Sequence, residues 1–173
     1  MMNPQEKLLL ECSRFRVHEI DVVDGNGRTR SREVIRHPGA VVLLPILADG
    51  RIVMIENHRH SVGETLLELP AGTIDPGETP AVTAGRELIE ETGYRAGELT
   101  KVYEFYSCPG ICDELMHLFI ATELTAGEPD REATEEIENR IVSPDEVRSM
   151  ISTGLIRDAK TLVGLYCLLE RGG

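Results

Sequence analysis

Hydrophobic and polar residues alternate over short runs in the first part of the chain, which is the pattern of half-buried strands. Strand-like runs cover LLLECSRFRV (8–17), HEIDVV (18–23) and RTRSREVIRH (28–37). The segment DGNG (24–27) separates the last two runs, and Asp-Gly and Asn-Gly between β-rich segments favour a hairpin turn. We therefore predict antiparallel strands over residues 8–36.

The next runs are more apolar, as expected of strands that are covered on both faces. AVVLLPIL (40–47) and RIVMIENHRH (51–60) flank the turn ADG (48–50), which predicts a second hairpin. Further strands are predicted at LLELP (66–70), KVYEFYS (101–107) and ELMHLFIATEL (114–124).

The C-terminal part of the chain has a helical period. Ser143, Pro144 and Glu146 show the spacing of a capping box with proline at the first helical position. The segment AKTLVGLYCLLE (159–170) carries an apolar stripe of helical spacing. Because strands and helices do not alternate regularly, we predict a mixed α/β chain of the α+β type and not a Rossmann-type fold.

Another helix is predicted between Thr79 and Gly93. Thr79 supplies a capping hydroxyl, and Pro80 follows at the first helical position, where no amide donor is needed. Gly93 suits the left-handed conformation in which many helices end.

The faces of this helix differ in character. At about 100° per residue, the carboxylates of Glu87, Glu90 and Glu91 share one narrow sector. Gly85 lies in the apolar sector, where its low helix propensity would be explained by a close approach of helix and sheet. The other residues of the apolar sector, which we expect to face the sheet, are Ala81, Val82, Ala84, Leu88 and Ile89.

Three carboxylates in one sector of a helix repel one another. Glu87 and Glu91 form an i,i+4 pair of like charges, which is mildly destabilising without a counter-charge. On the helix itself only Arg86, i,i+4 to Glu90, is placed to offset this repulsion. A solvated acidic face is one explanation of the cluster. The other, which we favour, is a divalent metal site, since hard cations prefer carboxylate oxygens.

Composition and charge narrow the classes of function. The 173 residues suit one domain, and the 41% hydrophobic and 28% charged residues are typical of a globular chain. No apolar run reaches the ~20 residues that span a bilayer, and the N-terminus lacks the pattern of an export signal, so we expect a cytoplasmic protein without a membrane partner. The net charge of −12 disfavours nucleic acid as a partner. An anionic small molecule remains a candidate substrate if divalent cations mediate the contact.

The residues around this helix resemble a known motif. The motif begins at Gly72, continues with Glu78 after five residues, and ends with REL-x-EE-x-GY (86–94) after seven more. This spacing resembles the Nudix box GX5EX7REUXEEXGU at every specified position. The resemblance implies a Nudix fold, with a mixed β-sheet sandwiched between helices and an N-terminal antiparallel strand extension. It also implies a hydrolase that cleaves nucleoside diphosphates linked to another moiety with the help of Mg²⁺ or Mn²⁺.

The same resemblance implies roles for the residues of the box. Glu87 and Glu91 would bind the metal, with help from Glu90 and from the carbonyl of Ala71. The other positions of the motif would have structural roles: an ion pair between Glu78 and Arg86, and loops shaped by Gly72 and Gly93.

Outside the box the chain is similar to the ADP-ribose pyrophosphatase branch of the family. Where that branch has a Ser-Pro-Gly turn, this chain has Ser107, then Cys108, then Pro109 and Gly110, so a cysteine separates the serine from the proline. The residues that match substrate-binding positions of the branch are Arg32, Glu33, Arg59, Pro109, Gly110 and Glu114. Ordinary surface positions on strands remain the alternative explanation for the two arginines.

A general base is expected on the acidic segment 127–138, GEPDREATEEIE. Glu132, Glu135 and Glu136 all qualify, and we place Glu135 first, while Glu90 of the box is a further candidate catalytic carboxylate.

We expect residues 1–38 to form a β extension that mediates dimerisation and residues 39–173 to form the Nudix hydrolase domain.

The favoured reaction is hydrolysis of ADP-ribose to AMP and ribose 5-phosphate by a homodimer. Alternatives are another nucleoside diphosphate sugar such as a GDP-hexose, an oxidised nucleotide, or a non-catalytic ADP-ribose sensor. The intact box and the negative charge disfavour a sensor that binds DNA.

Overall fold

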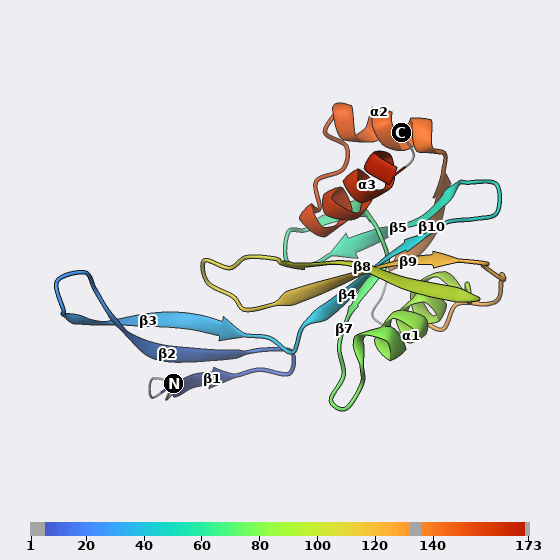
Figure 1. Ribbon diagram of the computed structural model, residues 1–173. Helices are drawn as coiled ribbons and strands as arrows, with labels where there is room; N and C mark the ends of the chain where they lie inside the picture. Colours follow the sequence, from blue (N-terminus) through green and yellow to red (C-terminus); the bar gives the residue numbers. More distant parts are fainter. Residues whose placement is uncertain (1–5, 132–135, 172–173) are drawn as a thin grey trace.

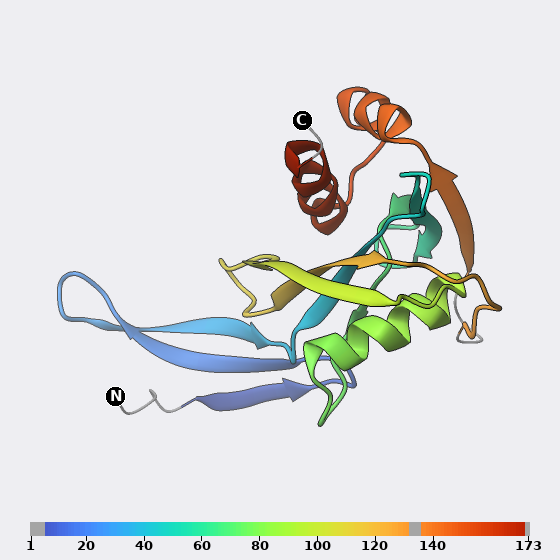
Figure 2. The same cartoon turned by 45° about the vertical axis from the view of Figure 1, so that its right-hand side comes forward.

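The structure is a computed structural model that describes residues 6–131 and 136–171. Its first part is an arm, a separate antiparallel sheet with the strand order β1-β2-β3 that extends away from the remaining elements (Figures 1 and 2). The arm consists of β1 (Lys7–Glu11), β2 (Arg16–Val23) and β3 (Thr29–Arg36). The predicted DGNG turn is confirmed, because the Asp24 carboxylate accepts hydrogen bonds from the amides of Asn26 and Arg28 at 2.9 and 3.0 Å.

The predicted first strand over 8–17 is wrong in its extent. The chain turns back at Cys12–Phe15, where the Cys12 amide donates to the Phe15 carbonyl at 2.9 Å. This turn lets β1 pair with β2 along an edge that a single long strand would not provide. Ser13 and Arg14 are two consecutive polar residues, so the alternation of polar and apolar residues is interrupted where the chain turns.

Two further sheets form the body of the molecule. One has the order β7-β4-β9-β8 and contains β4 (Ala40–Pro45), β7 (Ala71–Thr73), β8 (Glu98–Tyr106) and β9 (Leu115–Thr122). The other has the order β10-β5-β6 and contains β5 (Ile52–Arg59), β6 (Glu64–Glu68) and β10 (Ile137–Val142). The larger sheet is mixed, because β4 and β9 run parallel while its other pairs are antiparallel.

The hairpin predicted across residues 40–60 is confirmed at its turn but wrong in its strand pairing. The Leu47 amide donates to the Arg51 carbonyl at 2.8 Å and a single bridge joins Ile46 to Ile52, but β4 and β5 belong to different sheets. The two edges of β4 are taken by β7 and β9, so none is left for β5.

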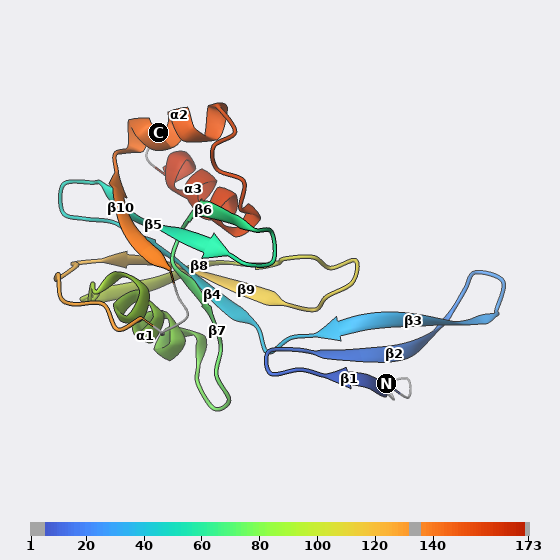
Figure 3. The same cartoon turned by 180° about the vertical axis from the view of Figure 1, so that it is seen from behind.

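β4 is buried on both faces, which explains its continuous apolar sequence. Val42 and Leu44 point into a core shared with the smaller sheet and the C-terminal helices, and Val41 and Leu43 point into a second core under α1. The helices are α1 (Pro80–Thr92), α2 (Pro144–Ser152) and α3 (Ala159–Arg171). Figures 1 and 3 show α1 on one side of the sheets and α2 with α3 on the other, so the α+β sandwich is confirmed.

The predicted ends of α1 are confirmed. The Thr79 side chain accepts a hydrogen bond from the Val82 amide at 3.4 Å, and Gly93 is left-handed with φ 80°. Gly93 is also held by contact, since a Cβ there would lie 2.5 Å from the carbonyl oxygen of Gly127.

The predicted inward face of α1 is only partly correct. Ala84 and Leu88 are buried as expected, but Val82 is 56% exposed and Glu91 is 3% exposed. The predicted apolar sector was too wide, and the helix turns its buried face toward Glu91. The close approach expected at Gly85 is also wrong, because a Cβ there would meet its nearest neighbour, Leu99, at an ordinary 3.7 Å.

The two C-terminal helices follow the sequence closely. Ser143 and Glu146 form the predicted capping box at the start of α2, and α3 covers the predicted segment. None of the helices in the described ranges is long and apolar enough to cross a membrane.

Candidate active site

An open cleft of about 1100 Å³ lies where the first turn of the arm, the loop before α1 and the start of α3 come together. The sequence-predicted residues that line it are Arg59, Ala71, Gly72, Glu78, Arg86, Glu87, Glu90, Glu91 and Glu114. The structure thus brings Gly72 and the charged residues of the box to one cavity, although they come from β7, the following loop and α1. Gly93, at the end of α1, does not line the cleft.

β7 and α1 approach each other closely at the cleft. The Ala71 amide donates a hydrogen bond to the Glu91 carboxylate at 2.9 Å. At Gly72, a Cβ would lie 1.9 Å from the carboxyl carbon of Glu87, so this carboxylate rests directly on the glycine backbone. A side chain at Gly72 therefore cannot be accommodated without moving Glu87, whereas one at Gly85 would meet only an ordinary contact.

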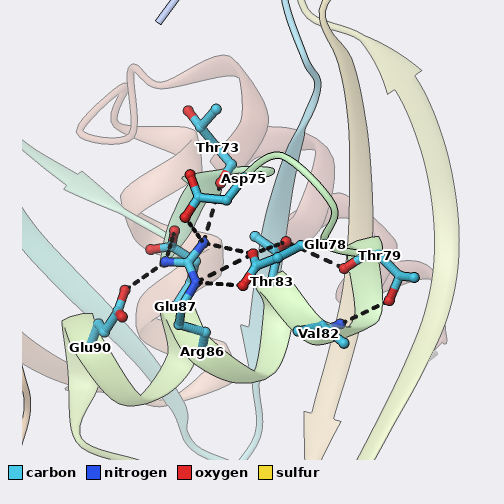
Figure 4. Close-up of polar contacts among 9 residues, drawn as sticks. All are labelled: Thr73, Asp75, Glu78, Thr79, Val82, Thr83, Arg86, Glu87 and Glu90. Atoms are coloured by element: carbon cyan, nitrogen blue, oxygen red, sulfur yellow. Dashed lines mark hydrogen bonds and ion pairs between the residues drawn. The ribbon is translucent and has the colours of Figure 1, made fainter. Parts of the chain in front are cut away.

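The Arg86 guanidinium lies at the centre of the box (Figure 4). Its Nη1 donates to Glu87 at 2.8 Å and to Glu90 at 2.7 Å, and its Nη2 donates to Glu78 at 3.1 Å. The ion pair expected between Glu78 and Arg86 is therefore present. The hydrogen bond with Glu78 is the main cause that raises the pKa of Arg86, and the same contact lowers the pKa of Glu78.

The oxygen atoms around Arg86 are of the type that a hard cation prefers as ligands. They are carboxylate oxygens from α1 and the backbone of β7, and Glu87 lies in a cradle that only a glycine leaves open. Within residues 6–131 and 136–171, no group of three or more His, Cys, Asp or Glu side chains is already arranged to hold a metal ion. In this arrangement Arg86 supplies the positive charge between Glu87 and Glu90.

A buried carboxylate organises a second group of residues in the cleft, which come from β5, β6 and the start of α3. Glu68 at the end of β6 is 1% exposed and accepts hydrogen bonds from Arg59 Nε at 2.8 Å and Arg59 Nη2 at 2.6 Å. Lys160, in the first turn of α3, forms an ion pair with the same carboxylate and a second one with Asp158 at 3.0 Å. The bidentate contact with Glu68 raises the pKa of Arg59.

Asp158 and Thr161 tie the start of α3 to the chain beside Glu68. The Asp158 carboxylate accepts from the Thr161 amide at 2.9 Å and from its hydroxyl at 2.6 Å. The Thr161 hydroxyl oxygen in turn accepts from the Leu69 amide at 2.8 Å. Lys160 is therefore held by a capped helix that is bonded to the chain next to Glu68.

Sequence reasoning missed Lys160 and Phe15 as residues of the cleft. The signal at Lys160 is a cation in the first turn of a helix, where the helix dipole disfavours positive charge. Phe15 was assigned to a strand interior, but it lies in the turn Cys12–Phe15 and lines the cleft.

Glu114 lines the cleft next to His37, whose Nδ1 lies 3.4 Å from a Glu114 carboxylate oxygen. Other predicted residues are not brought to the cleft. Pro109 and Gly110 are exposed outside its lining, and so are Arg32 and Glu33 on the arm.

The acidic segment is described only in part. Glu132 and Glu135, the favoured candidate base, lie outside the described residues. Glu136 is exposed and does not line the cleft, and its carbonyl accepts a hydrogen bond from the His58 amide at 3.2 Å.

Comparisons with known proteins agree with the arrangement of the box. The family model described as "NUDIX domain" matches residues 35–163. The chain is 40% identical over 150 residues to an ADP-ribose pyrophosphatase of Bacillus subtilis (strain 168), which covers 86% of this chain and 81% of the relative. It is 38% identical over 159 residues to a GDP-mannose pyrophosphatase of Cronobacter sakazakii, covering 86% and 83%.

A solved structure, titled as the crystal structure of an ADP compounds hydrolase, has a similar fold. The TM-score is 0.83 at 22% sequence identity, and the match covers 98% of this chain and 94% of that chain.

We expect Glu68→Gln to lower the free energy of unfolding by about 1–3 kcal/mol, because it removes the buried counter-charge of Arg59 and Lys160 while keeping the shape of the side chain. Urea denaturation measures the change. Glu64→Gln, on the same strand, is the matched control, because Glu64 forms an exposed ion pair with Arg157. Equal stability of the two variants would show that the buried cluster does not stabilise the fold.

Proposed function

The chain belongs to the NUDIX domain family of hydrolases, and we propose that it acts on ADP-ribose, with AMP and ribose 5-phosphate as products. The observation that carries this proposal is the cleft itself. Its lining combines the clustered carboxylates of the box with the cations Arg59 and Lys160, so it offers both cation-binding and anion-binding groups to a diphosphate.

We propose that Glu87 and Glu91 hold Mg²⁺ or Mn²⁺, with Glu90 and the Ala71 carbonyl as further donors. A bound divalent ion supplies charge that polarises a phosphate oxygen and lowers the pKa of a coordinated water. The chain itself supplies preorganisation, because the Ala71 amide and the Gly72 backbone fix Glu91 and Glu87. Arg86 keeps the carboxylates together by ion pairing.

The substrate would lie beside Arg59 and Lys160. Arg59 and Lys160 would neutralise the charge of the diphosphate, and their contacts with Glu68 keep both cations in place before it arrives. Phe15 offers a flat apolar face to a nucleobase. In the reaction a water oxygen forms a bond to phosphorus, the phosphoanhydride P–O bond breaks, and a general base accepts the water proton.

Glu135 remains our first candidate for this base, with Glu132 and Glu136 as alternatives on the same segment. Glu90 is the candidate that lies within the described site, and its carboxylate is engaged by Arg86 at 2.7 Å.

We propose a homodimer as the active form. Arg32 and Glu33 match substrate-binding positions, yet they lie on the arm and outside the cleft of their own chain. The arm also exposes Leu8, Leu10 and Val23, whose side chains are 48%, 53% and 66% accessible. Packing of residues 1–38 against a second copy would cover these side chains and bring Arg32 toward the partner's cleft.

Light scattering at micromolar concentration, combined with activity assays, tests the dimer. We expect twice the mass of one chain, and we expect Leu10→Glu to lower both the mass and the activity because it places a charge in the apolar contact. A monomer with full activity would contradict the proposal.

Glu87→Gln and Glu91→Gln should each lower kcat by at least about 10²-fold at saturating Mg²⁺ while the protein stays folded, because each replaces a charged oxygen ligand by a neutral one. Steady-state kinetics and circular dichroism measure the two effects. Glu98→Gln, an exposed change at the start of β8, is the control. Unchanged turnover in both box variants would remove the metal-site assignment.

A panel of nucleoside diphosphate sugars tests the substrate. With Mg²⁺ present, ADP-ribose should give AMP and ribose 5-phosphate with a higher kcat/KM than GDP-mannose or an 8-oxo nucleotide, because Arg32, Arg59 and Glu114 match the ADP-ribose branch. Chromatography separates the products. A clear preference for GDP-mannose would assign the chain to the second class, and binding of ADP-ribose without turnover would favour a sensor.

A further inference from the structure

The C-terminal end of α1 is covered by two segments that are distant in the sequence. Its last carbonyls accept hydrogen bonds from three donors: the Asp130 amide reaches Glu90 at 3.1 Å, Arg131 Nε reaches Glu91 at 3.0 Å, and Asn139 Nδ2 reaches Thr92 at 2.8 Å. A helix end leaves such carbonyls without partners inside the helix, so these donors satisfy them.

Arg131 and Asn139 also contact each other. Arg131 Nη2 donates to Asn139 Oδ1 at 2.9 Å, so the guanidinium and the amide form one unit, which we name the clamp. Asn139 lies on β10, paired with Ile55 of β5, and this ladder anchors the clamp to the smaller sheet. The clamp therefore connects the last turn of α1 to a rigid part of the body.

The clamp contacts Glu91, one of the two proposed ligands of the cation. The Glu91 backbone carbonyl is held by Arg131, while its carboxylate is held by the Ala71 amide at 2.9 Å. Glu91 is thus fixed at both its main chain and its side chain. The positive charge of Arg131 also stabilises the negative end of the helix dipole, which lies beside two carboxylates.

We propose that Arg131 and Asn139 are positioning residues for the divalent-cation site of α1. This inference rests on the proposed function, because it takes Glu90 and Glu91 as donors to the cation. Without the clamp the last turn of α1 frays, and cation binding must then order that turn as well as displace water from the cation. The clamp lowers this cost in advance and touches neither substrate nor cation.

The close contact at Gly93 supports a fixed position for the covering segment. A Cβ at this residue would lie 2.5 Å from the carbonyl oxygen of Gly127 and 2.8 Å from the nitrogen of Pro129. The segment that leads into Arg131 is therefore packed directly against the helix end by main-chain contacts, independently of the side chains of the clamp.

Arg131→Ala and Asn139→Asp test the proposal with Mn²⁺ as the probe. Calorimetry of Mn²⁺ binding to the full chain without substrate should show a dissociation constant raised about 10–100-fold in both variants, the usual cost of losing a group that orients a metal ligand. Asn139→Asp keeps the acceptor for Arg131 but replaces the donor to Thr92 by a charged oxygen. Arg131→Lys should fall between wild type and Arg131→Ala, since its single ammonium cannot reproduce the forked contact.

Arg140→Ala is the matched control. Arg140 neighbours Asn139 on β10, and it lies 3.9 Å from Glu56 in an exposed pair, so Mn²⁺ affinity should stay within about twofold of wild type. Hydrogen exchange adds a second readout. The Gly93 amide donates a hydrogen bond to the Ile89 carbonyl, and it should exchange faster in Arg131→Ala but at the wild-type rate in the control.

Two results would overturn the inference in different ways. If Arg131→Ala and Asn139→Asp lower Tm but keep the Mn²⁺ affinity of wild type, the clamp is only structural, and the proposed function stands. If Glu91→Gln itself binds Mn²⁺ as tightly as wild type, both the cation site and the clamp proposal fail.

Discussion

Electrostatic repulsion among the carboxylates of α1 is the constraint on which the arrangement of the site depends. Glu87, Glu90 and Glu91 lie on adjacent turns of one short helix, and like charges at this spacing destabilise a helix. Arg86 reduces this repulsion by forming ion pairs with Glu87 and Glu90, and the Ala71 amide donates a hydrogen bond to Glu91. The conformation of the loop before α1 depends on the same guanidinium, because Glu78 of this loop forms an ion pair with it.

The body of the fold holds these parts in register. β4 is buried on both faces, so it links the core beneath α1 to the core beneath the C-terminal helices. β7 pairs with β4 and carries Ala71 and Gly72, and α3, whose first turn carries Lys160, packs through Leu165 into the core that Val42 and Leu44 of β4 enter. Both groups of cleft residues are thus attached to β4, directly or through the core.

The box and both ends of α1 could be predicted because their signals are local. Thr79 and Gly93 terminate the helix through contacts within a few residues, and the spacing of the carboxylates places them on one helix face. The pairing of β4 could not be predicted, because its partners are chosen by competition between strands far apart in sequence. The contacts of Arg131 and Asn139 could not be predicted for the same reason. Both residues are about 40 or more positions from the end of α1 in the sequence, and only the fold brings their side chains to it.

The cleft carries more acidic than basic side chains along its lining. Glu68 and Asp158 offset Arg59 and Lys160, and Arg86 is already shared among the glutamates of the box. Arg14, Arg16 and Arg36 add positive charge elsewhere in the lining, so the excess of negative charge is small and is concentrated at the glutamates of the box. On the proposed function, a divalent cation at these glutamates would reverse the local field that an anionic substrate then meets, so the cation would favour binding of the diphosphate.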